Sequence, residues 1–209
     1  RLKELNLPII VATTNLKDDL PIVEMAQKNK CFIIKGSEND VLSRFVLASK
    51  TYNLTHMIRV CADNPFLQIS LIKNLIRKVN VKTDYLSYFF GNTPSIKTHW
   101  GIFAELVSIK SLNKISSIHV DSEYKEHVTN YIYENPDFFS IIKLKAPHII
   151  HKNFAIRLTV DTLDDFINMK GLYQKVVKKS SNFEIQNILD CVDDELILKM
   201  KVSINKNTK

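Results

Sequence analysis

Residues 8–65 read PIIVATTNLKDDLPIVEMAQKNKCFIIKGSENDVLSRFVLASKTYNLTHMIRVCADNP, and their pattern decides the fold. Short apolar runs of strand length alternate here with amphipathic segments of helical periodicity. We expect strands and helices in turn at residues 8–13, 18–30, 31–34, 37–51 and 56–61. This alternation is typical of a doubly wound, mostly parallel twisted sheet with helices on both faces. The stretch therefore predicts an α/β protein.

The chain beyond this stretch continues the pattern with less regularity. Pro65 is expected to start a helix, and Thr162 to Asp165 are expected to cap a later one. The apolar face of that later helix is predicted to hold Phe166, Ile167, Met169, Leu172 and Tyr173. Further strands are predicted at residues 85–90, 103–109, 140–144 and 155–160, and further helices at 123–135 and 183–200. We find no repeat or linker, so we predict one domain over residues 1–209.

Composition and charge exclude several classes of function. Of the 209 residues, 45% are hydrophobic and 24% are charged, which is ordinary for a globular protein. No window approaches 18 uninterrupted apolar residues, so we expect no membrane span. The net charge is +7, but 24 of the 29 basic residues are lysines, which are scattered apart from residues 175–179 and 199–209, so we expect no nucleic-acid partner. Three distant cysteines and no visible secretion signal predict free thiols and a cytoplasmic protein.

Polar residues follow three of the predicted strands, where a fold of this kind binds its ligands. The three segments are Thr13-Thr-Asn15, Gly36-Ser37 and Ala62-Asp63-Asn64. Asp63 is a candidate for chemistry, because a strand-end carboxylate can hold a hard cation together with phosphates. It is equally suited to cap the helix expected at Pro65, so both interpretations stay open.

Asp161 is a second candidate, at the end of the strand predicted at residues 155–160. It either binds a cation or caps the helix that follows it. Asp164 and Asp165 are better explained as negative charge in the first turn of that helix. Two strand-end aspartates can jointly hold one magnesium ion against a triphosphate, although their spacing does not show that they meet.

Arg44 and His127 are candidates for binding an anionic ligand. Arg44 lies on the helix after Gly36-Ser37, and it either binds a phosphate or carboxylate or lies in solvent. His127 either binds a substrate carboxylate or packs against its neighbours. The sequence contains no nucleophile–histidine arrangement, Walker loop or GxGxxG, so it does not support covalent catalysis.

Five segments occur in an order that resembles a known family. They are Ile10-Val-Ala-Thr-Thr14, Gly36-Ser-Glu-Asn-Asp-Val-Leu-Ser-Arg44, Arg59-Val-Cys-Ala-Asp-Asn-Pro65, Lys125-Glu-His-Val-Thr-Asn-Tyr-Ile-Tyr-Glu-Asn-Pro136 and Arg157-Leu-Thr-Val-Asp-Thr162. Together they resemble the cytidylyltransferase family of spore coat polysaccharide biosynthesis protein F. That family is related to the enzymes that activate acylneuraminate, legionaminate and 3-deoxy-manno-octulosonate, and the likeness covers nearly the whole chain.

The resemblance implies a Rossmann-like nucleotidyltransferase fold and magnesium-dependent transfer of CMP from CTP to a sugar acid, with release of pyrophosphate, for surface polysaccharides. It implies that Asp63 and Asp161 are the catalytic carboxylates and the ligands of Mg²⁺. The nucleotide-binding residues that it implies are Ala12, Thr13, Gly36, Ser37 and Arg44. The sugar-binding residues that it implies are Glu105, Lys125 and His127. It also implies a homodimer formed through the aromatic-rich segment at residues 85–103.

Members of this family begin with a strand and a loop that carries Arg, Gly-Ser and Lys and cradles the triphosphate. That segment is not found in this sequence, which begins at Arg1. A catalytically silent member that acts as a binding or scaffold protein therefore stays an alternative. A second alternative is a nucleotidyltransferase on the same fold that uses another nucleoside triphosphate.

Overall fold

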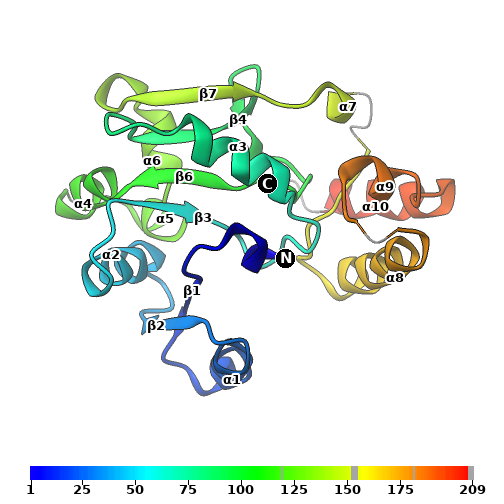
Figure 1. Cartoon of the computed structure of the whole chain (residues 1–209), viewed down its shortest axis with the longest axis horizontal. Helices are drawn as coiled ribbons and strands as arrows, with labels where there is room; N and C mark the ends of the chain where they lie inside the picture. The colour runs from blue at the N-terminus through cyan, green and yellow to red at the C-terminus, as the bar shows by residue number, and fades with distance from the viewer. Residues whose placement is uncertain (119, 152–154, 181, 207–209) are drawn as a thin grey trace. The chain divides into compact units, whose positions relative to one another are not determined.

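The computed structural model describes residues 1–118, 120–151, 155–180 and 182–206 (Figure 1). Its contacts divide the chain into two compact units. Unit 1 consists of residues 1–58, 78–86 and 106–142, and unit 2 consists of residues 59–77, 87–105 and 143–209. The single domain over residues 1–209 stays a prediction, because this division does not say whether either unit folds alone.

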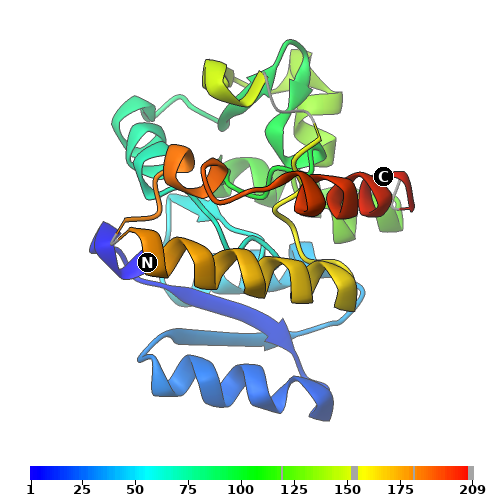
Figure 2. The same cartoon turned by 90° about the vertical axis from the view of Figure 1, so that its right-hand side faces the viewer.

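Two parallel strands open unit 1. β1 (Ile10–Thr14) pairs with β2 (Phe32–Gly36), in a register that places Thr14 opposite Gly36. α1 (Leu20–Lys28) connects them after the short turn η2 (Lys17–Asp19), and Figure 2 shows α1 below the pair. α2 (Val41–Thr51) contacts both strands. The carboxyl ends of β1 and β2 therefore lie side by side.

The other described strands form a mixed sheet. Its order is β3 (His56–Arg59), β6 (Glu105–Ser108), β4 (Tyr85–Phe90) and β5 (Thr93–Pro94), and β7 (Ile141–Lys145) also pairs with β4. β4 runs antiparallel to β5 and to β6. Only two residues join β4 to β5, and a parallel pair would need a long crossover. The α/β class is confirmed, with a sheet that is parallel at β1–β2 and mixed around β4.

The remaining described helices lie between and after these strands along the chain. They are α3 (Ile69–Lys78), α4 (Ile109–Ser117), α5 (Ser122–Glu126), α6 (Asn130–Glu134), α7 (His148–His151), α8 (Leu163–Lys179), α9 (Ile185–Leu189) and α10 (Asp194–Lys206). Single 3₁₀ turns lie at η1 (Leu2–Leu5), η3 (Ser95–Lys97) and η4 (Pro136–Phe138). Across the described part of the chain, none of the helices has the length and apolar character needed to span a bilayer.

The strands β4 and β6 supply much of the core. Tyr85 and Leu86 of β4 are fully buried, and all four residues of β6 are buried. Their polar members are hydrogen-bonded; the Ser108 hydroxyl, for example, donates to Asp84 Oδ1 at 3.2 Å. β1 and β3 each lie at the edge of a sheet, and their residues are mostly only half-buried.

The start of α2 differs from its prediction. Its N-cap is Asp40, whose Oδ1 accepts a hydrogen bond from the Ser43 amide at 2.7 Å. The helix therefore begins at Val41, and the predicted start at residue 37 is wrong. Asp40 lies three residues after the predicted start, and its side chain provides the cap.

The helix expected at Pro65 begins later, at Ile69. The Gln68 amide donates to the Ile102 carbonyl at 2.9 Å, and the Gln68 carbonyl accepts the first helical bond from Ile72 at 3.2 Å. The start of α3 is therefore set by a contact between residues that are far apart in the sequence.

Two helices predicted in the second half are each broken in the structure. Residues 123–135 form α5 and α6, which are separated at His127, where the backbone leaves the helical region (φ −97°, ψ 73°). The next residue, Val128, is fully buried. Residues 183–200 likewise contain α9 and the start of α10. The apolar periodicity of the sequence continues across each of these breaks, so the sequence pattern alone does not reveal them.

The strand predicted at residues 155–160 is wrong, although its apolar residues alternate as in a strand. Its amides bond to two separate loops: Leu158 donates to the His99 carbonyl at 2.8 Å, and Val160 donates to the Asp63 carbonyl at 3.0 Å. These single bonds do not form a ladder. They nevertheless fix the segment that leads to Asp161.

The predicted apolar face of α8 is only partly correct. Met169 and Leu172 are buried, whereas Phe166, Ile167 and Tyr173 are exposed. The buried face also contains Asp165 and Val176. The helix is turned so that the Asp165 carboxylate meets Arg157, and this rotation leaves Phe166 and Ile167 in solvent.

The aromatic segment at residues 85–103 is not an exposed patch. Tyr85, Phe89, Trp100 and Phe103 are all buried. Within unit 2, Phe103 packs edge-on against Phe90, with ring centroids 5.9 Å apart. These aromatic residues therefore pack in the interior. The homodimer stays a prediction, and the buried aromatic residues of this segment do not support it.

Candidate active site

A buried arginine organises the candidate site, which lies in unit 2. Arg157 is 1% exposed. Its Nη2 donates to Asp161 Oδ2, its Nε donates to Asp165 Oδ1 at 3.2 Å, and its Nη1 donates to His99 Nδ1 at 2.6 Å. The planar guanidinium thus binds three side chains with three different nitrogens, which the single nitrogen of a lysine could not do.

Asp165 connects this arginine to the first turn of α8. The Asp165 amide donates to Thr162 Oγ1 at 3.2 Å, and Asp165 Oδ2 accepts from the amides of Asp161 and Thr162, both at 3.1 Å. Burial alone would raise the pKa of Asp165, but hydrogen bonds from Arg157 and the Asp161 amide outweigh it and hold that pKa below its usual value. The predicted cap at Thr162 is confirmed as a capping box.

The backbones of the two predicted metal carboxylates are adjacent. The bond from the Val160 amide to the Asp63 carbonyl places Asp63 beside the residue that precedes Asp161. The Asp161 side chain is 28% exposed, and Asp63 is half-buried. The structure therefore brings together two aspartates that are 98 positions apart in the sequence.

Gly101 allows the close packing around this pair. Its backbone has a positive φ of 56°. A Cβ atom at this position would lie 2.7 Å from the Leu158 carbonyl oxygen and 3.0 Å from Asn64 Oδ1. Only glycine accepts both the conformation and the contact without strain. Gly101 therefore lets its loop press against the segments that carry Asp63 and Asp161.

The donor set of this cluster suits a hard divalent cation. Mg²⁺ is usually held by one or two carboxylates, while waters and phosphate oxygens complete its shell. Asp63 and Asp161 offer two carboxylates. Within the described residues, no group of three or more His, Cys, Asp or Glu side chains could hold a metal. The residues thus fit a cation shared with a phosphate ligand better than one enclosed by protein.

The carboxyl end of β1, in unit 1, carries a second polar cluster. Asp19 Oδ2 accepts from Thr13 Oγ1 at 2.7 Å, from the Thr14 amide at 3.0 Å and from Thr14 Oγ1 at 2.6 Å. The hydrogen bonds from Thr14 and then Thr13 lower the pKa of Asp19 below its usual value. This carboxylate therefore fixes the loop that follows β1.

Arg44 crosses the same strand ends. Its Nη1 donates weakly to the Ala12 carbonyl at 3.4 Å, and its Nε is buried with no acceptor among the described residues. A Cβ atom on Gly36 would lie 2.9 Å from Arg44 Cγ, so the glycine leaves room for the arginine side chain. Ala12, Thr13, Gly36 and Arg44 thus form one group, with Ser37 exposed beside it.

The three residues expected on the sugar side do not share one unit. Glu105 lies in unit 2, is 1% exposed and forms an ion pair with Arg59 at 2.6 Å. Lys125 and His127 lie in unit 1, at the end of α5, where Lys125 is half-buried and His127 is exposed. Only Lys125 and His127 are therefore accessible to a ligand by their own side chains.

Sequence reasoning missed three residues of these clusters: Arg157, His99 and Asp19. Arg157 was expected inside a strand, where its charge would need a partner or would protrude past an edge. The spacing of Arg157, Asp161 and Asp165 at four-residue intervals is a signal that could have been used. Asp19 gave no such signal, because its partners depend on how the chain turns after β1.

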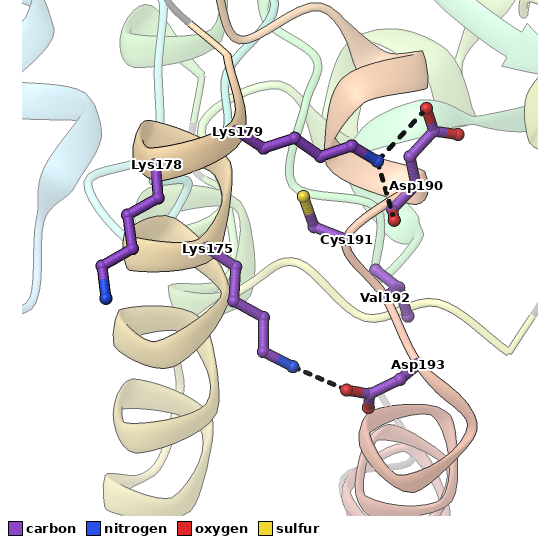
Figure 3. Close-up of a pocket in the computed structure, with 7 residues that line it drawn as sticks. All are labelled: Lys175, Lys178, Lys179, Asp190, Cys191, Val192 and Asp193. Carbon is purple, nitrogen blue, oxygen red and sulfur yellow. Dashed lines mark hydrogen bonds and ion pairs between the residues drawn. The ribbon is translucent and has the colours of Figure 1, made fainter.

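A cavity of about 550 Å³ lies at the other end of α8 (Figure 3). It is lined by Lys175, Lys178, Lys179, Asp190, Cys191, Val192 and Asp193. Lys175 pairs with Asp193 at 2.6 Å, and Lys179 pairs with Asp190 at 3.7 Å. At about 1.5 Å of rise per residue, α8 separates this cavity from Asp161 by roughly 24 Å. The cavity is therefore not part of the aspartate cluster.

Comparisons with known proteins identify a family for this chain. A family model described as cytidylyltransferase matches residues 3–187. Spore coat polysaccharide biosynthesis protein SpsF of Bacillus subtilis is 32% identical over 169 residues, covering 80% of this chain and 67% of that protein. The uncharacterized protein MJ1063 of Methanocaldococcus jannaschii is 36% identical over 204 residues, covering 96% of this chain and 78% of that protein.

The fold has a counterpart among solved structures. A cytidylyltransferase from Leptospira borgpetersenii serovar Hardjo-bovis matches with a TM-score of 0.72 and 23% sequence identity. The match covers 96% of this chain and 79% of that chain. At this level of identity the likeness establishes the fold alone.

Proposed function

This chain belongs to the cytidylyltransferase family, and from that premise we propose that it transfers CMP from CTP to a sugar acid and releases pyrophosphate. The resemblance noted in the sequence is confirmed, and the protein is a nucleotidyltransferase. The observation that carries the proposal is the hydrogen bond from Val160 to the Asp63 carbonyl, because it brings Asp63 and Asp161 together.

We propose that Asp63 and Asp161 hold Mg²⁺. When bound, the ion supplies charge neutralisation on the triphosphate. Attack of a sugar hydroxyl on the α-phosphate needs positioning and charge stabilisation more than a covalent nucleophile. Support for this assignment comes from the buried network behind Asp161, which holds its carboxylate and its backbone amide in place.

We propose that the nucleotide binds at the carboxyl ends of β1 and β2. The nucleotide would contact backbone groups and small side chains of Ala12, Thr13, Gly36 and Ser37. Arg44 would bind one of its phosphate or carbonyl oxygens. Two observations support this role: the buried Nε of Arg44 has no acceptor among the described residues, and Asp19 rigidifies the adjacent loop. An oxygen of the ligand would satisfy that donor.

On the sugar side, we propose that Lys125 and His127 bind the carboxylate of the acceptor. Both side chains are accessible, and both can donate to an anionic oxygen. Glu105 belongs to the same proposal, but it is buried against Arg59 and would act by holding that arginine. The similarity to SpsF supports a role in polysaccharide biosynthesis. The proposed homodimer and cytoplasmic location are consistent with such a pathway.

The test is release of pyrophosphate from each of CTP, UTP, ATP and GTP, with Mg²⁺ and a panel of sugar acids. We expect turnover with CTP. Asp63→Asn and Asp161→Asn should each lower kcat/KM at least about a hundredfold, because several kcal/mol of charge stabilisation depends on the carboxylates. Asp193→Asn, at the far end of α8, is the matched control and should retain activity.

Each contrary result has a definite meaning. Turnover with another nucleoside triphosphate in place of CTP would identify that nucleotide as the donor. Full activity in Asp63→Asn or Asp161→Asn would overturn the metal assignment. No turnover with any nucleotide and no binding of CTP would favour a catalytically silent binding protein.

A further inference from the structure

We propose that Arg157 is the positioning residue of Asp161: its buried guanidinium fixes the carboxylate in the orientation that ligates the cation. This inference rests on the proposed function, because it takes Asp161 as a cation ligand. It gives a role to a charged side chain that is only 1% exposed and to which the sequence resemblance assigned none.

The geometry holds Asp161 at two points. Its side chain accepts from Arg157 Nη2, and its amide donates to Asp165 Oδ2 at 3.1 Å. Arg157 also donates to Asp165, through Nε at 3.2 Å and through Nη2 at 3.3 Å. The three residues thus form a closed ring of hydrogen bonds, in which the backbone and side chain of Asp161 are fixed together.

Arg157 itself is anchored away from Asp161. On the opposite side of the guanidinium, Nη1 donates to His99 Nδ1 at 2.6 Å. That bond requires a His99 tautomer whose Nδ1 carries no proton. With 1% of its surface exposed and anchors at Asp165 and His99, the guanidinium cannot follow Asp161 if the carboxylate turns. Asp161 therefore has to adopt the orientation that Arg157 sets.

The burial of Arg157 separates positioning from direct catalysis. A side chain with 1% exposure does not meet the substrate, whereas Asp161, at 28%, does reach the surface. Arg157 therefore acts through Asp161 and not on the substrate, as the hydrogen-bond partners of metal ligands commonly do. Loss of such partners typically weakens metal binding by about 10- to 100-fold.

Two effects of the arginine on a cation oppose each other. Its hydrogen bonds orient Asp161 and favour cation binding, while its positive charge repels the cation. Arg157→Lys keeps the positive charge and removes the planar guanidinium with its separate nitrogen donors, so it isolates the positioning effect. Arg157→Met removes both, and should bind a cation more tightly than Arg157→Lys if repulsion is substantial.

The experiment measures binding of Mn²⁺ to the full chain by the electron paramagnetic resonance signal of the free ion, without nucleotide or turnover. We expect the Kd for Mn²⁺ to rise about tenfold in Arg157→Lys. The control is Met169→Ala, which removes a buried side chain from α8, the helix that follows Asp161, and leaves Asp161 itself unchanged. It should lower the melting temperature and leave the Kd unchanged.

A Kd in Arg157→Lys equal to that of the unmodified protein would overturn the positioning role and leave a structural one. Asp161→Asn distinguishes this failure from failure of the proposed function. If Asp161→Asn abolishes Mn²⁺ binding while Arg157→Lys does not alter it, only the positioning role fails. If the unmodified chain binds no Mn²⁺, or Asp161→Asn binds it normally, the metal assignment fails and the role of Arg157 fails with it.

Discussion

Asp19 in unit 1 and Asp165 in unit 2 are both held as carboxylates, but by different means. Asp19 lies near the surface, and neutral hydroxyl and amide donors of Thr14 and Thr13 lower its pKa. Asp165 is 3% exposed, so burial opposes its charge, and the guanidinium of Arg157 has to overcome that opposition.

The difference shows what each cluster can do. Hydrogen bonds to a surface carboxylate exchange readily with water or a ligand, and they contribute little to stability. A buried charge that loses a partner has no replacement, so the Arg157 network is rigid and its members depend on one another. The loop after β1 is therefore fixed by contacts that water or a ligand can replace, whereas the segment before Asp161 is held by contacts that have no replacement.

Arg157→Met should have the largest effect on stability. It leaves Asp165 buried without its ion-pair partner, and breaking a buried pair in this way costs about 3–5 kcal/mol of unfolding free energy. Urea unfolding followed by circular dichroism measures the loss. A loss below about 1 kcal/mol, the size typical of a surface pair, would remove the contrast between the two clusters.

Gly101→Ala should have the next largest effect. A positive φ of 56° is strained for alanine, at a cost of about 1–3 kcal/mol, and the new Cβ would also collide with the Leu158 carbonyl. Gly91→Ala is the matched control, since it has a similar φ of 62° but nothing within 4 Å of its Cβ. The difference in unfolding free energy between the variants measures the close packing, and equal losses would assign the effect to the backbone alone.

Asp19→Asn should have the smallest effect, visible in acid. Because the pKa of Asp19 is lower in the folded than in the unfolded state, its carboxylate stabilises the fold above the unfolded value of about 3.9. That contribution disappears as pH falls through the lower, folded pKa. Unfolding free energies from pH 6 to pH 2.5 should therefore converge for the variant and the unmodified protein at the acidic end. A constant difference at every pH would contradict this role.

Much of the fold followed from local pattern. β1, β2, β4 and β7 lie where bounded apolar runs predicted them, and the cap at Thr162 is present because its partner Asp165 is three residues away. In such cases, the interactions that decide the structure join residues close in sequence. The choice of Asp63 and Asp161 as a pair came from the family resemblance, and their adjacency came from the structure.

The rest depended on contacts between distant residues. The segment at residues 155–160 has the alternation of a strand, but its amides bond to loops near His99 and Asp63. α8 faces inward with Asp165 because Arg157 is buried there, which its apolar residues alone did not predict. Arg157 and His99 are 58 positions apart, so no local rule relates them.

The position of β1 at the edge of its sheet has a consequence for the protein at high concentration. An edge strand presents backbone amides and carbonyls that its own sheet does not pair, and an extended segment of another molecule can bond to them. β1 reads Ile10-Val-Ala-Thr-Thr14, with no charged residue or proline to oppose such addition. Because backbone bonds select no particular side chains, self-association at this edge would rise with protein concentration alone.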